Sequence, residues 1–285
     1  MHEQFDYEDV FMGVLRTFKS DYRLKRLTEA VKLRKGKMLD IGCAGGIFTE
    51  SLIEYYPHVQ IYGCDVSKTA IHYAKKLNSG KVKYDVIKSK RLPYKSNFFD
   101  VCVCLDVMEH VPDVDFFLKE VKRILKKNGQ FFLLVPCEGQ PFTFTWLFQK
   151  IKMGNKMTYQ NWGHIHPEFT HKNVTQLLID KGFSIKKITY SEHIFWQIVS
   201  LLVYFWPKEI LTFFLGKKAH EYSDSGVIRA KDKGKEKKDI IMLARKIFLG
   251  FNSLLRELTY WETNIFKKIP LAAWKIHLLA LNKKI

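Results

Sequence analysis

The chain has 285 residues, of which 47% are hydrophobic and 14% aromatic, and its formal net charge is +18. This length and composition allow one sizeable domain with an appendage and argue against extended disorder. The positive charge favours an anionic partner, namely nucleic acid, an acidic membrane face or a charged substrate, unless the lysines only solvate the surface.

Strand-like and helix-like segments alternate along most of the chain. A helical segment is expected first, within residues 1–36. Apolar runs then predict strands at 36–42, 59–67, 81–87, 98–107 and 130–136, with helices at 45–56, 68–77 and 114–125 between them. A further helix, a glycine stop and a strand follow within residues 170–190.

This regular alternation with short connections is typical of a doubly wound α/β fold with a mostly parallel sheet. We expect the core over residues 37–192 and a last core strand at 239–246. Residues 193–238 interrupt the pattern as an apolar helical insert with a basic linker, and residues 247–285 are predicted to form amphipathic C-terminal helices.

A glycine-containing loop and an acidic residue point to a nucleoside cofactor. The loop LDIGCAGGIFTE joins the first strand to the first core helix, and Gly42 allows a sharp turn close to a ligand. Asp65 ends the second strand, where a carboxylate can accept both hydroxyls of a ribose. A complete G-x-G-x-x-G pattern is missing, which argues against a nicotinamide cofactor, and no P-loop motif is present.

The segments LDIGCAGGIFTE, IYGCDVS, RLPYKSNFFDVCVCLDVMEHVPD and LKKNGQFFLLVP occur in this order with short gaps. Together they resemble the class I S-adenosylmethionine-dependent methyltransferases, in the branch that includes the ubiquinone and menaquinone pathway enzymes. The likeness is strong over residues 37–136 and loose over 164–245. It implies a Rossmann-like, seven-stranded sheet and S-adenosyl-L-methionine as the cofactor, but it says little about the substrate.

The resemblance also implies cofactor contacts. Asp65 would hold the ribose, Val66 would lie against the adenine and Leu105 near the methyl group. The methionine part would be surrounded by the loop residues Asp40, Gly42, Cys43, Ala44 and Gly46. Ala44 replaces a usual glycine, which is tolerable if its φ is negative. Lys88 replaces an acidic residue that often meets the adenine amino group, and Ser89 is the substitute we expect.

The sequence LDVMEHVPD follows the fourth strand and places Asp106, Glu109 and His110 at spacings i, i+3 and i+4. If the strand turns directly into a helical turn, all three side chains point one way. Three interpretations stay open. His110 acts as a general base for a hydroxyl, the three side chains bind a divalent cation, or the segment is a structural turn before the next helix.

The second polar cluster contains His164 and His166, which follow the fifth strand beside the expected substrate mouth. His164 is either a base or substrate contact, or a histidine that packs the loop beside Trp162. Two histidines at i and i+2 with no nearby ligand pattern are poor evidence for zinc. We therefore expect His110, Asp106 and His164 as the catalytic candidates and no metal site.

The apolar insert is too short to span a membrane. Its continuous part, residues 194–206, has thirteen residues, whereas a span needs about 20. A hairpin in the membrane interface or an apolar lid over the substrate fits better. The C-terminal tail combines an apolar stripe with cationic residues, as in a peripheral membrane helix, or else packs with the insert as a cap or a homodimer interface.

The five cysteines form no C-x-x-C pair and lie mostly in apolar runs, which indicates reduced, buried thiols in a cytosolic protein. The polar N-terminal sequence does not resemble a signal peptide. We predict a cytoplasmic methyltransferase, peripheral at the inner face of the membrane, that O-methylates a hydrophobic small molecule. The alternatives are a methyltransferase for a soluble glycan, natural product or tRNA, and a non-catalytic membrane-associated relative. Nucleic acid is the least favoured partner, because the sequence contains no recognised RNA-binding module.

Overall fold

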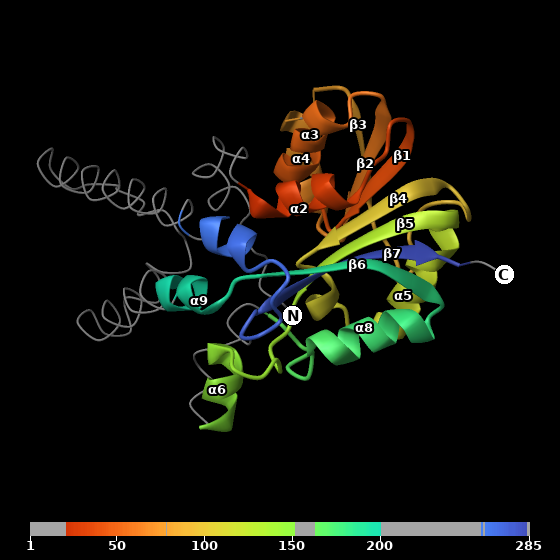
Figure 1. Cartoon of the computed structure of the whole chain (residues 1–285). Helices are drawn as coiled ribbons and strands as arrows, with labels where there is room; N and C mark the ends of the chain where they lie inside the picture. The colour runs from red at the N-terminus through yellow and green to blue at the C-terminus, as the bar shows by residue number, and fades with distance from the viewer. Residues whose placement is uncertain (1–20, 78, 152–162, 201–257, 259, 284–285) are drawn as a thin grey trace, which may run out of the picture.

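The computed structural model describes residues 21–77, 79–151, 163–200, 258 and 260–283 (Figure 1). The described elements are, in chain order, α2 (Tyr22–Ala30), β1 (Gly36–Ile41), α3 (Ile47–Tyr55), β2 (Val59–Asp65), α4 (Lys68–Leu77), β3 (Val82–Val86), β4 (Phe99–Leu105), the 3-10 turn η2 (Met108–His110), α5 (Val114–Ile124), β5 (Leu125–Pro136), α6 (Phe144–Lys150), α8 (His171–Asp180), β6 (Phe183–Ser191), α9 (Ile194–Ser200) and β7 (Lys275–Asn282).

The strands form one seven-stranded sheet with the order β3-β2-β1-β4-β5-β7-β6. The first five strands pair in parallel, and β7 runs antiparallel to both of its neighbours. Strand order reverses between β1 and β4, so the carboxyl ends of these two strands flank the point where open α/β sheets bind ligands. The predicted doubly wound, mostly parallel fold is confirmed.

Alternating side chains of the central strands supply two separate hydrophobic cores. In β4, Val101 and Val103 face the core that α2, α3 and α4 cover, whereas Cys102 and Cys104 face the core beneath α5 and α8. Helices thus cover both faces of the sheet, as Figure 1 shows. The near-continuous apolar runs of the parallel strands follow from this burial on both sides.

The seventh strand corrects the predicted organisation of the C-terminus. Lys275–Asn282 forms β7, inserted between β5 and β6, although we predicted helices throughout 247–285. Its sequence is almost continuously apolar, and such a short run does not distinguish a buried strand from a buried helix. The strand predicted at 239–246 lies outside the described residues.

Within the described part of the tail, residues 258 and 260–265 are helical as predicted. In the insert, α9 is helical as expected, and residues 201–257 lie outside the described part of the chain. Among the described helices, none combines the length and the apolar character that crossing a membrane requires.

Candidate active site

The loop after β1 is shaped by glycines that no other residue could replace without movement. Gly42 has a φ of +76°, and a Cβ atom there would lie 2.2 Å from Cγ2 of Val107. Gly46 begins α3 with a φ of +80°, and its Cβ would lie 2.6 Å from the hydroxyl of Tyr84. The backbone of this loop therefore packs tightly against Val107, which follows β4, and against Tyr84 of β3.

Ala44 does not meet the condition, a negative φ, under which alanine is tolerable in place of the usual glycine. Its φ is +46°, because its amide donates a hydrogen bond of 2.9 Å to Oδ2 of Asp65 and so fixes the turn. The amide of Ser67 donates to the other oxygen of the same carboxylate at 2.8 Å. Each carboxylate oxygen has a second lone pair, so Asp65 can still accept ribose hydroxyls.

The other residues predicted to contact the cofactor differ in how far their side chains are exposed. Val66 is 73% exposed directly after Asp65, as an adenine contact requires. Leu105 is partly buried at the end of β4. Ser89 is exposed, and its hydroxyl accepts a hydrogen bond from the amide of Arg91 within its own loop. The carboxylate of Asp65, which keeps free lone pairs, and the exposed Val66 fit the ribose and adenine parts of S-adenosylmethionine.

Two predicted contacts of the methionine part are buried beneath the loop. The carboxylate of Asp40 accepts a hydrogen bond of 2.7 Å from the hydroxyl of Thr49, and burial raises the pKa of Asp40 to about 7. Cys43 is 6% exposed, and burial raises the pKa of its thiol far above the usual value. Its sulfur therefore stays protonated and acts as a small packing group.

The chain does not turn directly from β4 into a helical turn, which was the condition for Asp106, Glu109 and His110 to point one way. Asp106 has a φ of +53°, and the 3-10 turn begins only at Met108, so its side chain leaves in another direction. Its carboxylate lies 2.9 Å from Nζ of Lys275 and 3.7 Å from a guanidinium nitrogen of Arg23. Although burial acts to raise it, these cations hold the pKa of Asp106 below its usual value.

Glu109 and His110 instead lie beside His164. Oε1 of Glu109 is 3.8 Å from Nε2 of His110 and 3.9 Å from Nε2 of His164. Glu109 is 1% exposed, and neither of its carboxyl oxygens has a hydrogen-bond partner in another described residue. Burial raises its pKa well above the usual value, and the nearby Asp106 adds to this effect. Burial lowers the pKa of His110, whose Nδ1 lies 3.0 Å from the carbonyl oxygen of Gly163.

The same three side chains satisfy the spacing that a metal ion would require. One donor atom each from Glu109, His110 and His164 lies within 4.8 Å of the others. The cation set considered from the sequence contained Asp106 in place of His164, and Asp106 does not belong to this group. An arrangement of one carboxyl and two imidazoles can equally hold an acceptor hydroxyl and move its proton.

Glu138 is one site residue that sequence reasoning missed. It follows β5 by two residues, and its Oε1 lies 2.6 Å from Nδ1 of His164. Both side chains are buried, with 1% and 8% of their surfaces exposed. The signal in the sequence was a carboxylate at the carboxyl end of a buried strand, the same rule that identified Asp65.

Three further missed residues are Tyr22, Arg23 and Lys275. They come from the first and last described elements and converge on Asp106 and on Glu192 after β6. Nζ of Lys275 lies 3.2 Å from Oε1 of Glu192, and the hydroxyl of Tyr22 donates to the same oxygen. No local sequence pattern connects positions separated by more than 250 residues.

Comparison with known proteins agrees with this geometry. Residues 39–133 match the family model described as a methyltransferase domain. The chain therefore carries a class I S-adenosylmethionine-dependent methyltransferase domain, and S-adenosylmethionine is the cofactor of that class.

Curated relatives are more specific about chemistry but cover only part of the chain. A ubiquinone biosynthesis O-methyltransferase from Pelagibacter ubique is 40% identical over 104 residues, which span 35% of this chain and 42% of the relative. The enzyme of the same name from Coxiella burnetii is 29% identical over 177 residues, 59% of this chain and 71% of the relative. The chain thus spans less than half the length of the first relative.

Solved structures share the fold. A phosphoethanolamine N-methyltransferase from Haemonchus contortus, in complex with S-adenosyl-L-methionine, has a TM-score of 0.53 at 16% identity and covers 92% of this chain and 52% of that one. A geranyl diphosphate C-methyltransferase from Streptomyces coelicolor has a TM-score of 0.52 at 11% identity and covers 92% and 77%. These two methylate different kinds of atom, so the fold alone does not name the acceptor.

Proposed function

We propose that the protein transfers a methyl group from S-adenosylmethionine to an oxygen atom of a hydrophobic small molecule. One observation carries this proposal: His164, His110 and Glu109 converge beside the end of β4, next to the residue expected near the methyl group. Such a set suits an acceptor that must lose a proton. The ubiquinone biosynthesis O-methyltransferases among the relatives support oxygen as the acceptor atom.

When bound, S-adenosylmethionine supplies an electrophilic methyl group on a sulfonium centre. The loop after β1 and Asp65 would hold it so that its methyl group faces the acceptor oxygen. An imidazole would take the proton of the acceptor hydroxyl as the new carbon–oxygen bond forms, and the thioether product would leave uncharged. Correct placement of the two reactants can supply much of the rate, and the base contributes typically about 10²–10⁴-fold.

A test of this function uses labelled S-adenosylmethionine and phenols or catechols that carry an apolar chain. We expect an O-methylated product by mass spectrometry, and we expect His164→Asn to lower turnover by about 100-fold without loss of cofactor binding in calorimetry. Cofactor binding accompanied by methylation of amines or thiols only would refute the assignment to oxygen.

A helical cap beside the site supports a hydrophobic substrate. The cap consists of α6, α9 and helix 260–265, and hydrogen bonds connect its parts. The amide of Phe144 donates to Gln197, and the amides of Phe195 and Trp196 donate to Glu262. The ring of Trp196 stacks on Trp274 at 5.4 Å, and Trp274 in turn lies 6.3 Å from the ring of His164. The apolar cap thus adjoins the proposed base.

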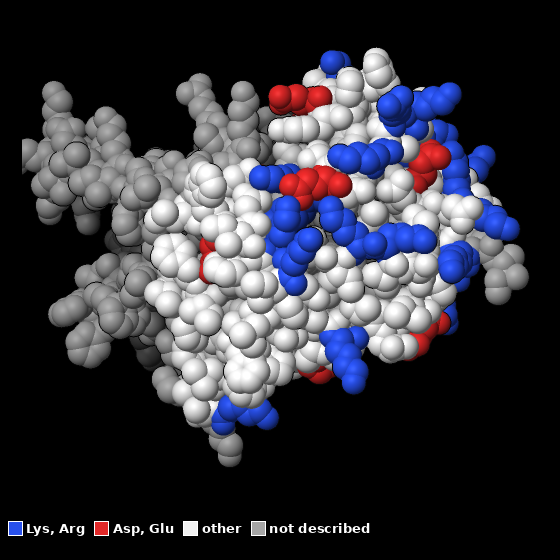
Figure 2. All heavy atoms as spheres, viewed as in Figure 1, with Lys and Arg blue, Asp and Glu red and all other residues white. Residues whose placement is uncertain are grey.

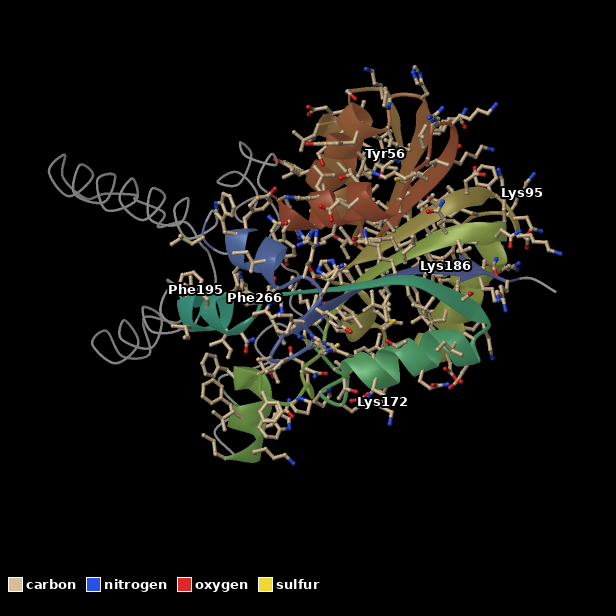
Figure 3. All side chains as sticks on the ribbon, in the orientation of Figure 1. Tyr56, Lys95, Lys172, Lys186, Phe195 and Phe266 are labelled. Atoms are coloured by element: carbon tan, nitrogen blue, oxygen red, sulfur yellow. The ribbon has the colours of Figure 1, made fainter. Side chains whose placement is uncertain are left out.

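The outer surface of the cap exposes apolar side chains. On the cap, the most exposed include Trp261 (63%) and Ile265 (68%), and Phe142 (65%) just before α6 and Leu271 (62%) after helix 260–265 are also exposed. Figure 2 shows few charged side chains on this end of the described molecule, whereas lysines and arginines gather elsewhere on the same face. Figure 3 shows Phe195 on the cap and Phe266 directly after its last helix, at the opposite end from Lys95.

We infer that the cap docks on an anionic membrane surface, from which it would receive a membrane-borne acceptor. Exposed Lys150 and Lys268 border the apolar side chains and supply the complementary charge. In sedimentation with vesicles that contain phosphatidylglycerol, we expect Trp261→Ser with Ile265→Ser to weaken binding.

A matched control is Ile179→Ser, because Ile179 is 47% exposed but lies on α8, outside the cap. This control should bind vesicles like the wild type. Equal binding by all variants would contradict membrane docking. Light scattering tests the alternative that the cap forms a homodimer. That alternative would be correct if the wild type has twice the monomer mass and binds no vesicles, and if the cap variant is a monomer.

A further inference from the structure

Two histidines of the loop before α8 each lie against a glutamate, yet the two pairs have different surroundings. His164 and Glu138 are buried, with 2.6 Å between Nδ1 and Oε1. His166 lies 2.9 Å from Glu168, but 61% of the Glu168 side chain is exposed. The other ring nitrogen of His166, Nε2, lies 2.8 Å from the carbonyl oxygen of Val111, which can only accept a hydrogen bond.

These contacts decide which nitrogen of each ring can take a proton. In His166, the nitrogen that meets the Val111 carbonyl must carry hydrogen, so that atom cannot act as a base. In His164, the carboxylate of Glu138 meets Nδ1, whereas Nε2 lies on the side of Glu109 and His110. A carboxylate accepts hydrogen bonds, so it favours the tautomer with hydrogen on Nδ1 and a lone pair on Nε2.

We propose that Glu138 is the positioning residue of the methyl-transfer site: it orients His164 and fixes the tautomer in which Nε2 receives the proton of the acceptor. This role rests on the proposed O-methyl transfer. In that step the acceptor O–H bond breaks, its proton binds Nε2 of His164, and the oxygen forms the bond to the methyl carbon. Glu138 itself keeps its charge and stabilises the imidazolium that forms.

The backbone around Glu138 is held before any substrate arrives. The carbonyl oxygen of Glu138 accepts hydrogen bonds from Thr145 and Gln149 of α6, each at 3.3 Å. The next amide, that of Gly139, donates to the carbonyl of Phe169 at 2.9 Å. Glu138 is thus fixed between β5, α6 and the histidine loop, as a group that positions another side chain must be.

The second carboxyl oxygen of Glu138 also points to a role in positioning His164. Oε2 is buried and has no hydrogen-bond partner among the described residues. A buried carboxylate that pairs with only one imidazole is expensive to keep for stability alone. Its negative charge is, however, useful beside a ring that becomes positively charged during the reaction. Glu109 is the other acidic group beside His164, and Asp106 is near enough to interact with it electrostatically.

The experiment compares Glu138→Gln with Glu168→Gln, which removes the charge of the exposed pair. Nitrogen NMR of histidine-labelled protein at neutral pH reads the tautomer directly. We expect hydrogen on Nδ1 of His164 in the wild type and in Glu168→Gln, and a mixture of tautomers in Glu138→Gln. With labelled cofactor, kcat should fall by about 100-fold in Glu138→Gln and stay within about threefold in the control, with KM and cofactor affinity little changed.

The NMR and kinetic results test the role of Glu138 separately from the proposed O-methyl transfer. Hydrogen on Nε2 in the wild type, or an unchanged tautomer and an unchanged kcat in Glu138→Gln, would overturn the role of Glu138. The wild-type spectrum alone provides this test if Glu138→Gln fails to fold. A protein that binds the cofactor but methylates no oxygen acceptor contradicts the proposed function, whereas the tautomer measurement remains valid as a test of the His164–Glu138 pair.

Discussion

Replacement of Lys275 by methionine tests how much the ion pairs between the two ends of the described chain stabilise the fold. Nζ of Lys275 lies 2.9 Å from Asp106 and 3.2 Å from Glu192, and the exposed fractions of these side chains are 12%, 27% and 3%. Methionine conserves the length of the side chain but leaves the two carboxylates facing each other. Removing one partner from a buried ion pair costs about 3–5 kcal/mol.

We expect a cost at the lower end of that range, because Asp106 and Glu192 each keep another partner. Arg23 still lies 3.7 Å from Asp106, and the hydroxyl of Tyr22 still donates to Glu192. Burial already raises the pKa of Glu192, so this carboxyl can take up a proton when its cation is lost. We therefore expect Lys275→Met to lower the free energy of unfolding in urea by about 3 kcal/mol.

The pH dependence of this loss follows from Asp106. Its pKa is lower in the folded protein than in the unfolded chain, so its ion pair stabilises the fold above about pH 4. That stabilisation is lost as the pH falls through the lowered folded-state pKa. The difference in stability between the wild type and Lys275→Met should therefore shrink below about pH 4.

A double-mutant cycle with Glu192→Gln isolates the ion pair from other effects of the methionine. The double variant should be more stable than the sum of the single losses predicts, by at least about 0.5 kcal/mol, because the two groups are in contact. Lys186→Met is the matched control, since Lys186 is exposed on β6, and its loss should stay within about 0.5 kcal/mol. A loss below about 1 kcal/mol in Lys275→Met, with no coupling in the cycle, would refute the reasoning.

Three further predictions concern single residues. Asp65→Ala should weaken S-adenosylmethionine binding by about 10–100-fold in calorimetry, because charge-assisted hydrogen bonds to the ribose are lost; unchanged affinity would exclude the carboxylate from the cofactor site. Ala44→Gly should raise the free energy of unfolding by about 0.5–1 kcal/mol, since glycine adopts a φ of +46° without the cost that a Cβ imposes; a lower stability in urea would contradict this. Burial lowers the pKa of His171 to about 4, so the unfolded chain, with a pKa of about 6.5, binds a proton first. Stability should therefore decrease by up to about 3 kcal/mol as the pH falls from 6.5 to 4, and His171→Gln should flatten that decrease in urea titrations.

The doubly wound core could be predicted from the sequence, because local patterns specify each of its elements. Apolar runs of strand length, amphipathic helices and short glycine turns alternate from residue 36 to residue 136, and each unit packs next to its neighbour. The positions of Asp65 and His164 near the carboxyl ends of strands followed from the same rule, because parallel strands bring those ends to one edge of the sheet.

Features that depend on contacts between distant segments became clear only in the folded structure. Whether Lys275–Asn282 is a strand depends on the gap between β5 and β6, since a short apolar run fits either secondary structure. The turn at Asp106 separates this residue from Glu109 and His110, although sequence spacing favoured a common face. Glu138 meets His164 because two loops pack together, and no periodicity within either loop predicts that contact. Local propensity fixes which elements form, whereas the burial of charges and apolar runs against distant segments fixes how the site is assembled.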